Sequence, residues 1–440
     1  MNVLRYTDPD FAERLAAISR GSSLFDPVIE QRTRDILEAV RTRGDEALLD
    51  FTERFDGVRL TAGQLAVTHA EFFNASLRAD AVLRRTLRFA ERNIANFSRR
   101  SLRRTWCSRN AQGAKVGENY HPFQRVGIYI PGGTAPLVST VLMTVVLARV
   151  AGCPEIVVCT PCREDGQVNA ALLLAARLAG ATEVYRVGGA QAIAAMALGT
   201  PTIRPVQKVF GPGNAYVVTA KRLLVGHVAI DLLPGPSELF VLADAAANPV
   251  YIAADLLAQA EHGSGHERVW LATPSARLLR AVHSEVKRQL ADLPRSEFIK
   301  HALTQGGWLI QVRNLEQGVA LANQLAPEHC EIHARNARRW SDRILTAGAI
   351  FLGPWSPTVL GDYVAGPSHT LPTGGAGRSF AGLTVDQFQR RTSVVEYERR
   401  SLAKSLAAVR ALGELEGLQA HARSAQVRFE CRGPAHRLRA

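Results

Sequence analysis

Apolar residues recur at helical spacing through the first part of the chain, which predicts an N-terminal region built from helices. Ile29, Ile36 and Val40 share one face of the first predicted helix. Gly57 and Gly63 punctuate the helices that follow. The predicted helices cover 29–40, 45–55 and about 71–97, and a hairpin is predicted over 104–120 with its turn at 110–113.

From residue 125 onward, short apolar runs alternate with helical patterns, and this alternation is typical of parallel α/β sheets. A first set has predicted strands at 126–130, 155–159, 183–187 and 206–210, with helices at 138–150, 170–178, 191–198 and 214–223. A second set has strands at 239–243, 268–271, 308–312 and 349–352, with helices at 249–261, 276–290 and 315–325. The tail from about residue 386 is predicted to be helical and basic, with an amphipathic run over 412–427. We therefore predict an α/β protein with two Rossmann-like parallel-sheet units, a helical N-terminal region and a helical C-terminal arm.

Composition places the chain among ordinary globular proteins, since 47% of its 440 residues are hydrophobic and 21% are charged. The start of the chain lacks a basic-then-apolar signal pattern, and no apolar stretch reaches the roughly 18 residues that span a bilayer. We therefore expect a soluble cytoplasmic protein that does not use a membrane.

The net charge of +13 raises the alternative of a nucleic-acid partner. The basic residues are mostly scattered arginines, and the one dense cluster lies at 99–104. We interpret this charge as a solvated surface and expect no nucleic acid. Binding of that kind would weaken steeply as salt rises, which separates the two readings.

The cysteines are irregularly spaced and include a single CxxC pair, Cys159 and Cys162. A zinc ribbon needs four ligands, so we interpret this pair as buried structural thiols beside a turn.

Candidate metal chemistry begins at Gln259 and His262, three residues apart at the end of a predicted helix, where both can reach one ion. The structural alternative is a helix end at which His262 meets the last carbonyl groups. His266 is another nearby nitrogen ligand that spacing does not exclude. Two further N/O donors, Asp362 and His421, stand alone far downstream.

An adjacent pair, Glu328 and His329, suits two proton transfers such as activating a water and deprotonating an alcohol. Neighbours on a regular strand point to opposite faces, so a shared site requires irregular backbone, which Pro327 favours. The alternative reading is an exposed strand start.

Two loops complete the candidate chemistry. The segment 353–369 is long and rich in Gly and Pro and carries Asp362 and His369, although it can also be a simple connector. The turn Gly211-Pro-Gly-Asn214 offers close backbone approach for a nucleotide phosphate but lacks the third glycine of a dinucleotide fingerprint. We expect ligands at the carboxyl ends of the parallel strands.

Six motifs resemble those of the histidinol dehydrogenase family over roughly residues 30 to 428. They are Arg-Val-Gly-Ile-Tyr-Ile-Pro-Gly-Gly (125–133), Val-Phe-Gly-Pro-Gly-Asn-Ala (209–215), Gly-Pro-Ser-Glu (235–238), Leu-Leu-Ala-Gln-Ala-Glu-His-Gly (256–263), Ala-Pro-Glu-His (326–329) and Gly-Asp-Tyr-Val-Ala-Gly-Pro-Ser-His-Thr-Leu-Pro-Thr (361–373). The resemblance implies oxidation of L-histidinol to L-histidine through L-histidinaldehyde in two NAD-dependent steps, the last steps of histidine biosynthesis.

The resemblance also implies a role for each matching residue. One zinc per subunit would be held by Gln259, His262, Asp362 and His421 and would anchor the substrate. Glu328 would activate water, and His329 would be the general base and would also contact substrate. The remaining substrate contacts would be Ser237, His369 and Glu416, and the NAD contacts would be Tyr129, Gln191 and Asn214.

The family is a homodimer in which a C-terminal arm completes the partner's active site, which implies the same for His421 and Glu416 here. We expect an N-terminal arm over 1–25, a larger domain from 26–125 with 238–380, an NAD-binding domain over 126–237 and a helical dimerisation arm over 381–440. The alternatives are an NAD-dependent dehydrogenase of another polar alcohol, such as a sulfonated propanediol, and a thiol mechanism through Cys153 or Cys330.

Overall fold

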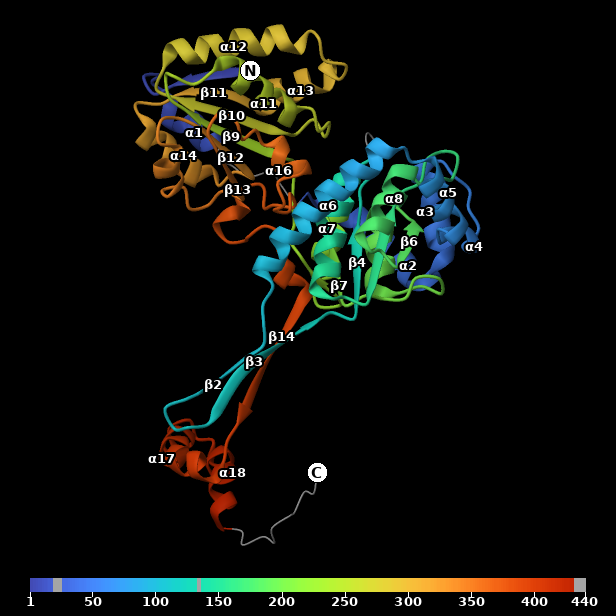
Figure 1. The fold of residues 1–440 in the computed structure, drawn as a ribbon, viewed down its shortest axis with the longest axis vertical. Coiled ribbons are helices and arrows are strands. Elements are labelled where there is room, and N and C mark those ends of the chain that lie inside the picture. Colours follow the sequence, from blue (N-terminus) through green and yellow to red (C-terminus); the bar gives the residue numbers. More distant parts are fainter. Residues whose placement is uncertain (19–25, 133–135, 431–440) are drawn as a thin grey trace. The chain divides into compact units, whose positions relative to one another are not determined.

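The computed structural model describes residues 1–18, 26–132 and 136–430 (Figure 1). The chain forms two compact units. The first comprises residues 1–102 and 123–388, and the second comprises residues 103–122 and 389–440. The first unit contains two parallel sheets, and the second contains an antiparallel one.

The five-stranded sheet of the first unit has the order β6-β5-β4-β7-β8, and its strands are parallel. The strands are β4 (Arg125–Tyr129), β5 (Glu155–Thr160), β6 (Glu183–Arg186), β7 (Lys208–Phe210) and β8 (Ala229–Ile230). The chain starts at β4, winds outward to β6, and then continues on the other side with β7. This doubly wound order places a crevice at the carboxyl ends of β4 and β7, where the winding direction reverses.

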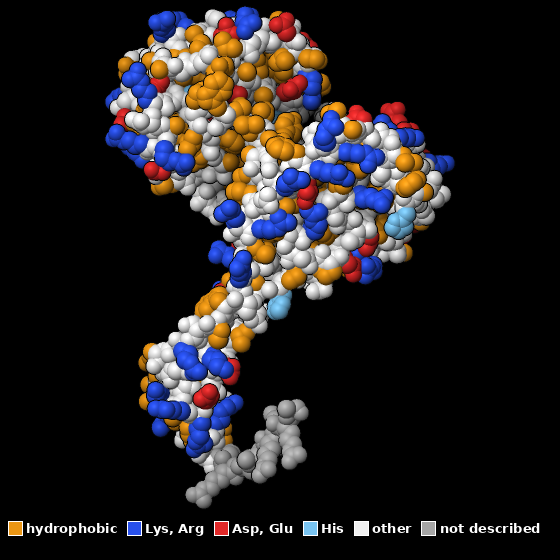
Figure 2. All heavy atoms as spheres, viewed as in Figure 1, with side chains coloured by type: hydrophobic (Ala, Val, Ile, Leu, Met, Phe, Trp, Pro, Cys, Tyr) orange, Lys and Arg blue, Asp and Glu red, His pale blue; other side chains and the backbone are white. Residues whose placement is uncertain are grey.

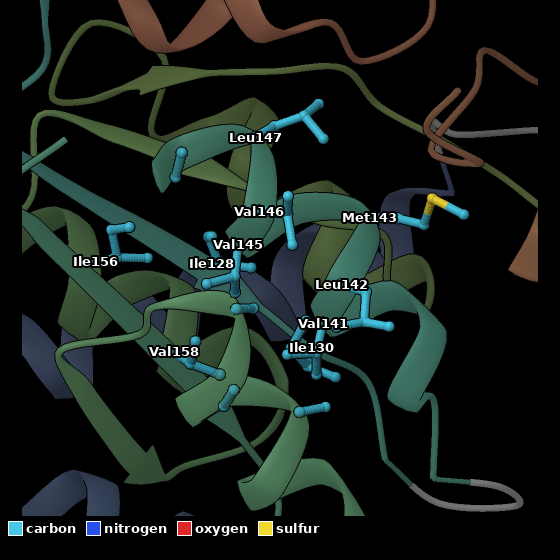
Figure 3. Close-up of a cluster of buried hydrophobic side chains, with 14 of the residues drawn as sticks. Ile128, Ile130, Val141, Leu142, Met143, Val145, Val146, Leu147, Ile156 and Val158 are labelled. Carbon is cyan, nitrogen blue, oxygen red and sulfur yellow. The ribbon is translucent and has the colours of Figure 1, made fainter. Parts of the chain in front are cut away.

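Helices cover both faces of this sheet (Figure 1). One face carries α5 (His69–Arg78), α6 (Ala81–Ser101), α7 (Val138–Ala151) and α8 (Ala170–Ala179), and the other carries α2 (Pro27–Arg43), α3 (Asp45–Asp56), α9 (Gly189–Leu198) and α10 (Ala215–Leu223). In Figure 3, Ile128 of β4 and Ile130, which directly follows that strand, lie among the valines and leucines of α7. Tyr129, between them, belongs to the opposite core, as strand alternation requires.

The six-stranded sheet has the order β1-β11-β10-β9-β12-β13 and is also parallel. Its strands are β1 (Asn2–Arg5), β9 (Glu238–Ala243), β10 (Arg268–Thr273), β11 (Gly307–Gln311), β12 (His329–His333) and β13 (Ala349–Leu352). The order from β9 to β13 repeats that of the first sheet, and the N-terminal strand β1 is added at one edge. The reversal point here lies between β9 and β12.

The two cores of this sheet follow from strand alternation. Leu239 and Val241 of β9 pack under one helical layer, and Phe240 and Leu242 pack under the other. The first layer contains α11 (Pro249–Ala260), α12 (Ala276–Leu290) and α13 (Ser296–Gly306), and the second contains α1 (Phe11–Ile18), α14 (Leu315–Leu325) and α15 (Ala337–Ser341).

The second unit is an antiparallel sheet, β14-β3-β2, followed by a pair of helices. Its elements are β2 (Trp106–Arg109), β3 (Lys115–Pro122), β14 (Gln389–Glu396), α17 (Arg399–Leu415) and α18 (Gln419–Glu430). The hairpin expected over 104–120 is present. The tail is not helical from residue 386, because 389–396 pair with β3 as a strand.

The expected fold class is confirmed, with two parallel α/β sheets, N-terminal helices and a C-terminal arm that ends in helices. The helix expected over 71–97 is two helices, because Asp80 caps a new one by accepting a hydrogen bond from Leu83 N. The strands β1 and β12 and the helix α13 were not anticipated as elements. The domain boundaries stay a prediction, although helices α2, α5 and α6 pack against helices of the five-stranded sheet.

The short helices α4 (Ala62–Leu65) and α16 (Val359–Tyr363) and the 3-10 turns η1 (Ala376–Arg378) and η2 (Val385–Phe388) complete the described elements. Among the described residues, no helix is long and apolar enough to cross a membrane. On the face shown in Figure 2, Lys and Arg side chains are spread among apolar and acidic ones.

Candidate active site

Glu328 and His329 lie at the amino end of β12 in the six-stranded sheet, beside the start of β9, and both are buried. The backbone of Glu238, at the start of β9, contacts both side chains. Its N–H donates to Glu328 Oε2 at 2.9 Å, and its carbonyl oxygen lies 3.1 Å from His329 Nδ1. The alternative that the pair is an exposed strand start is therefore wrong, because both side chains are buried at the start of the strand.

Irregular backbone precedes the pair, as a shared site requires. Ala326 ends α14 in the left-handed conformation with φ 49°, and Pro327 follows it. This turn lets Glu328 and His329 approach each other, with 3.5 Å between Glu328 Oε2 and His329 Nδ1.

Burial sets the protonation of the pair. It raises the pKa of Glu328 well above the ordinary value, and the nearby Glu238 and Asp362 carboxylates add to this, against the hydrogen bond from Glu238 N. Burial lowers the pKa of His329, and the charge of Asp362 opposes that shift only in part. A neutral imidazole beside a carboxyl group of raised pKa suits proton transfer near neutral pH.

Three histidines in this region direct Nδ1 at a backbone carbonyl. His262 Nδ1 lies 3.0 Å from Gln259 O, His329 Nδ1 lies 3.1 Å from Glu238 O, and His369 Nδ1 lies 3.1 Å from Asp362 O. A carbonyl only accepts, so Nδ1 carries the proton in each ring when it is neutral. The lone pair is then on Nε2, which is the atom that binds a metal or takes a proton.

Gln259 is buried in the last turn of α11, and its Nε2 has no hydrogen-bond partner within the described parts of the chain. The helix ends at Ala260, so the exposed His262 stands in the turn after it rather than on the helix. The contact of its Nδ1 with Gln259 O is the interaction with a helix-end carbonyl group that the structural alternative predicts. That contact leaves Nε2 available, so His262 can interact with the helix end and bind a metal ion at the same time. His266 is exposed a few residues further on.

Asp362 lies on the short helix α16, within a segment expected to be a loop. Its Oδ1 is 3.9 Å from His329 Nε2 and 3.8 Å from His369 Nδ1. His369 Nε2 in turn lies 3.1 Å from the hydroxyl of Thr140. Burial lowers the pKa of His369, which keeps this imidazole neutral.

The remaining predicted residues fall into two groups. Ser237 is half-buried immediately before β9, and its hydroxyl hydrogen-bonds to the Glu328 carboxylate, which opposes the rise in the Glu328 pKa. Glu416 and His421 belong to the second unit, where Glu416 caps the end of α17 and His421 is exposed on α18.

The donors of the first unit fit a zinc ion. Gln259 contributes a buried carboxamide, whose oxygen is the atom that would bind the ion, His262 an imidazole whose Nε2 is available, and Asp362 a carboxylate beside His329. Nitrogen and oxygen donors of this kind are those that zinc takes, and three protein ligands leave room for a fourth.

A cavity of about 1200 Å³ opens at the carboxyl edge of the five-stranded sheet, and Tyr129, Gln191 and Asn214 all line it. The Tyr129 hydroxyl accepts a hydrogen bond from Gly189 N, and Asn214 caps α10 by accepting from Tyr216 N and Val217 N. Gln191 is buried, and its Oε1 lacks a partner in the described portion of the structure. The cavity lies at carboxyl strand ends, where a ligand site was expected, whereas Glu328 and His329 lie at the amino end of a strand.

A buried ion pair that the sequence did not single out holds the turn after β7, near the cavity. Lys221 and Asp231 form a fully buried ion pair that grips Gly211, since Lys221 Nζ donates to Gly211 O and Gly211 N donates to Asp231 Oδ2. A Cβ on Gly211, whose φ is 110°, would stand 2.1 Å from Tyr129 O. A long-range ion pair of this kind has no local sequence signal.

The cysteines are structural in character. Five are free thiols among the described residues, and Cys159 and Cys162 are buried, as expected. Burial raises the pKa of Cys153 to about 12 and raises that of Cys330 further, which keeps both thiols protonated and poorly nucleophilic.

Two Rossmann-like sheets, a cavity at the reversal point of one and a buried acid/base pair at the edge of the other define an α/β enzyme fold. The family model for histidinol dehydrogenase matches residues 20–429. The chain belongs to the histidinol dehydrogenase family, and it is an oxidoreductase.

Named relatives agree with this assignment. Histidinol dehydrogenase of Geobacillus kaustophilus is 47% identical over 396 residues, which cover 90% of this chain and 93% of that protein. Histidinol dehydrogenase of Syntrophotalea carbinolica is 43% identical and covers 98% of this chain and 99% of its own. The crystal structure of histidinol dehydrogenase from Elizabethkingia anophelis has a TM-score of 0.92 at 34% identity, with 98% of each chain covered.

Proposed function

We propose that the protein oxidises L-histidinol to L-histidine through L-histidinaldehyde, with NAD as hydride acceptor in both steps, at the end of histidine biosynthesis. The observation that carries the proposal is the buried Glu328–His329 pair, in which His329 Nε2 faces Asp362 at 3.9 Å. Membership of the family and the fit of Gln259, His262 and Asp362 to a zinc ion support it.

In the first step, His329 Nε2 would take the hydroxyl proton of the alcohol, and NAD, when bound, would supply the hydride acceptor, so that the alcohol becomes the aldehyde. In the second step, Glu328 would take a proton from water as the oxygen adds to the aldehyde carbon. His329 would return its proton to the former carbonyl oxygen, which completes the hydrate and frees Nε2 to act as a base again. His329 would then take a hydroxyl proton of the hydrate, and a second NAD would accept the hydride from the same carbon, which leaves the carboxylic acid. The raised pKa of Glu328 makes its carboxylate a stronger base than an exposed glutamate.

Bound zinc would hold the substrate's nitrogen atoms and so orient the reacting carbon. Its ligands would be Gln259, His262 and Asp362 with His421 of the second unit, one ion per subunit. Ser237, His369 and Glu416 would contact substrate.

NAD would occupy the cavity that Tyr129, Gln191 and Asn214 line. The unpaired Gln191 Oε1 supports this, because a buried acceptor without a partner is costly and a ligand donor would satisfy it. The turn at Gly211 allows the close backbone approach that a phosphate needs.

We further propose a cytoplasmic homodimer in which His421 and Glu416 serve the neighbouring subunit. Exposed leucines on the C-terminal helices support a partner, because Leu412, Leu415 and Leu418 are 58%, 83% and 42% exposed. The free thiols suit a reducing compartment.

The test is to give the purified protein L-histidinol and NAD and to count NADH per alcohol consumed. About two NADH per alcohol, with histidine as product, is the expected result. Turnover of another polar alcohol without turnover of histidinol would favour the second candidate, a dehydrogenase of a different substrate on the same fold.

A further inference from the structure

A buried group of polar side chains, Asp255, Glu331 and His333, lies next to the proposed active site and has no role in the proposed reaction. His329, Glu331 and His333 alternate along β12 and therefore face the same side of the sheet. That side is covered by α11, which contributes Asp255. Nε2 of His333 lies 3.2 Å from Glu331 Oε2 and 3.7 Å from Asp255 Oδ2, so the three side chains form one buried group.

Glu331 also anchors the element that carries Asp362. Its Oε1 accepts hydrogen bonds from the backbone N–H of Thr358, at 2.7 Å, and from the Thr358 hydroxyl. The Thr358 carbonyl in turn accepts from Gly361 N at 2.8 Å and from Asp362 N at 3.3 Å. One buried carboxylate thus holds the residue from which the turn bearing Asp362 begins.

Asp255 extends the same group toward the other proposed ligands. It lies four residues before Gln259 on α11, so the two side chains share one face of that helix. The group therefore touches or adjoins the three elements that present Gln259, His329 and Asp362.

We propose that Glu331, supported by Asp255 and His333, is the positioning residue that sets Asp362 for zinc. This inference rests on the proposed function. A five-residue helix such as α16 is not stable on its own, so its place depends on the contacts at its start. Residues that orient metal ligands in this way typically contribute a factor of 10 to 100 to metal affinity.

The same three side chains are also close enough to hold a metal ion. We favour the positioning role because Glu331 already accepts from Thr358 with one oxygen and meets His333 with the other. A second ion would have to displace these contacts, and metal stoichiometry separates the two readings.

The experiment measures zinc affinity of the full-length protein by competition with a chelator, together with kcat and KM for histidinol. Glu331→Ala should weaken zinc binding about tenfold or more, whereas Glu331→Gln, which keeps an acceptor for Thr358, should stay within about threefold of wild type. If Glu331→Ala does not fold, Thr358→Val tests the inference instead, because it removes only the hydrogen bond from the Thr358 hydroxyl to Glu331. It should weaken zinc binding severalfold, and Thr358→Ser should restore it.

Thr273→Val is the matched control, since Thr273 is also a buried threonine but lies at the carboxyl end of β10, two strands away from β12, and it should leave zinc affinity unchanged. Folded Glu331→Ala and Thr358→Val proteins with wild-type zinc affinity would overturn the inference. So would two zinc ions per chain that fall to one in His333→Ala. A wild-type protein that binds zinc but does not oxidise histidinol would instead refute the proposed function and leave the positioning result to stand on affinity alone.

Discussion

Two neighbouring residues, Glu328 and His329, would carry different proton transfers in the proposed reaction because their surroundings differ. His329 donates Nδ1–H to the Glu238 carbonyl and presents Nε2 to Asp362, whereas the Glu328 carboxylate accepts from Glu238 N. One backbone residue on the neighbouring strand therefore orients both groups. Orientation by rigid backbone leaves little conformational freedom to lose when substrate binds.

Replacing Glu328 should separate the two oxidations. Glu328→Gln keeps the side-chain volume but removes the base that activates water, so the second step should slow by about 10² to 10³ while the first is less affected. With an aldehyde trap present, NADH per histidinol should fall from about two toward one. An unchanged ratio of two at normal rate would exclude Glu328 as the water activator.

Replacing Asp56, which lines the cavity, should stabilise the protein to an extent that depends on pH. Burial raises its pKa from 3.8 to about 6, so the folded state disfavours the charged form. Ionisation of the buried Asp56 therefore destabilises the folded state. This destabilisation is absent below about pH 4, grows between about pH 4 and 6, and reaches its full size above about pH 6. Asp56→Asn should therefore raise the free energy of unfolding at pH 8 by about 1 kcal/mol, a figure reduced because the side chain is partly solvated.

Denaturant unfolding at pH 4 and pH 8 checks this expectation. The gain should vanish at pH 4. Asp35→Asn is the control, because Asp35 lines the same cavity but is exposed, and it should give no such difference.

At the scale of elements, the turn between β7 and α10 depends on a clamp from outside it. Lys221 and Asp231 hold the carbonyl and the N–H of Gly211 and are themselves fully buried. Asn214 then starts α10 at the cavity wall. The position of this turn thus depends on two residues that follow Gly211 by ten and by twenty positions in the sequence.

Lys221→Met should destabilise the protein by about 3–5 kcal/mol, because it leaves the Asp231 carboxylate buried without its cation. Lys221→Met combined with Asp231→Leu removes both charges and should recover most of that loss. Chemical denaturation of the single and double variants measures the difference. Equal stability of the two variants would show that the ion pair does not act as a unit.

At the scale of the whole molecule, the proposed active site needs residues from both units of the chain. His421 and Glu416 lie on the C-terminal helices, whose Leu412, Leu415 and Leu418 are exposed. In Figure 2, apolar side chains gather along one edge of these helices. A dimer in which this surface meets a second copy would cover it.

Mixed dimers test the shared site. His421→Ala should lose zinc and activity, and Glu328→Ala should lose activity alone. Mixing the two inactive proteins should restore up to about one site in two per heterodimer, because one site then draws all its residues from intact copies. Verified heterodimers without activity would refute a shared site, and activity in each variant alone would refute the assigned roles.

Hydrophobic periodicity was sufficient for most helices and strands of the two sheets, and long motifs were sufficient for the family, because both depend on residues close together in sequence. Hydrophobic periodicity did not predict the elements whose structure depends on pairing between strands that are remote in sequence. Residues 389–396 became a strand through pairing with β3, and β1 found its place only beside β11.

The candidate residues were also recognised from sequence, but their arrangement was not. Alternation on β12 places His329, Glu331 and His333 on one side, yet only the folded chain brings Asp255 and Thr358 to them. The Lys221–Asp231 pair and the Glu238 backbone contacts are likewise invisible in the linear chain. Local patterns therefore predicted the fold class and the candidate site residues, whereas burial, tautomer and distance arose from packing, because each depends on neighbours that are remote in sequence.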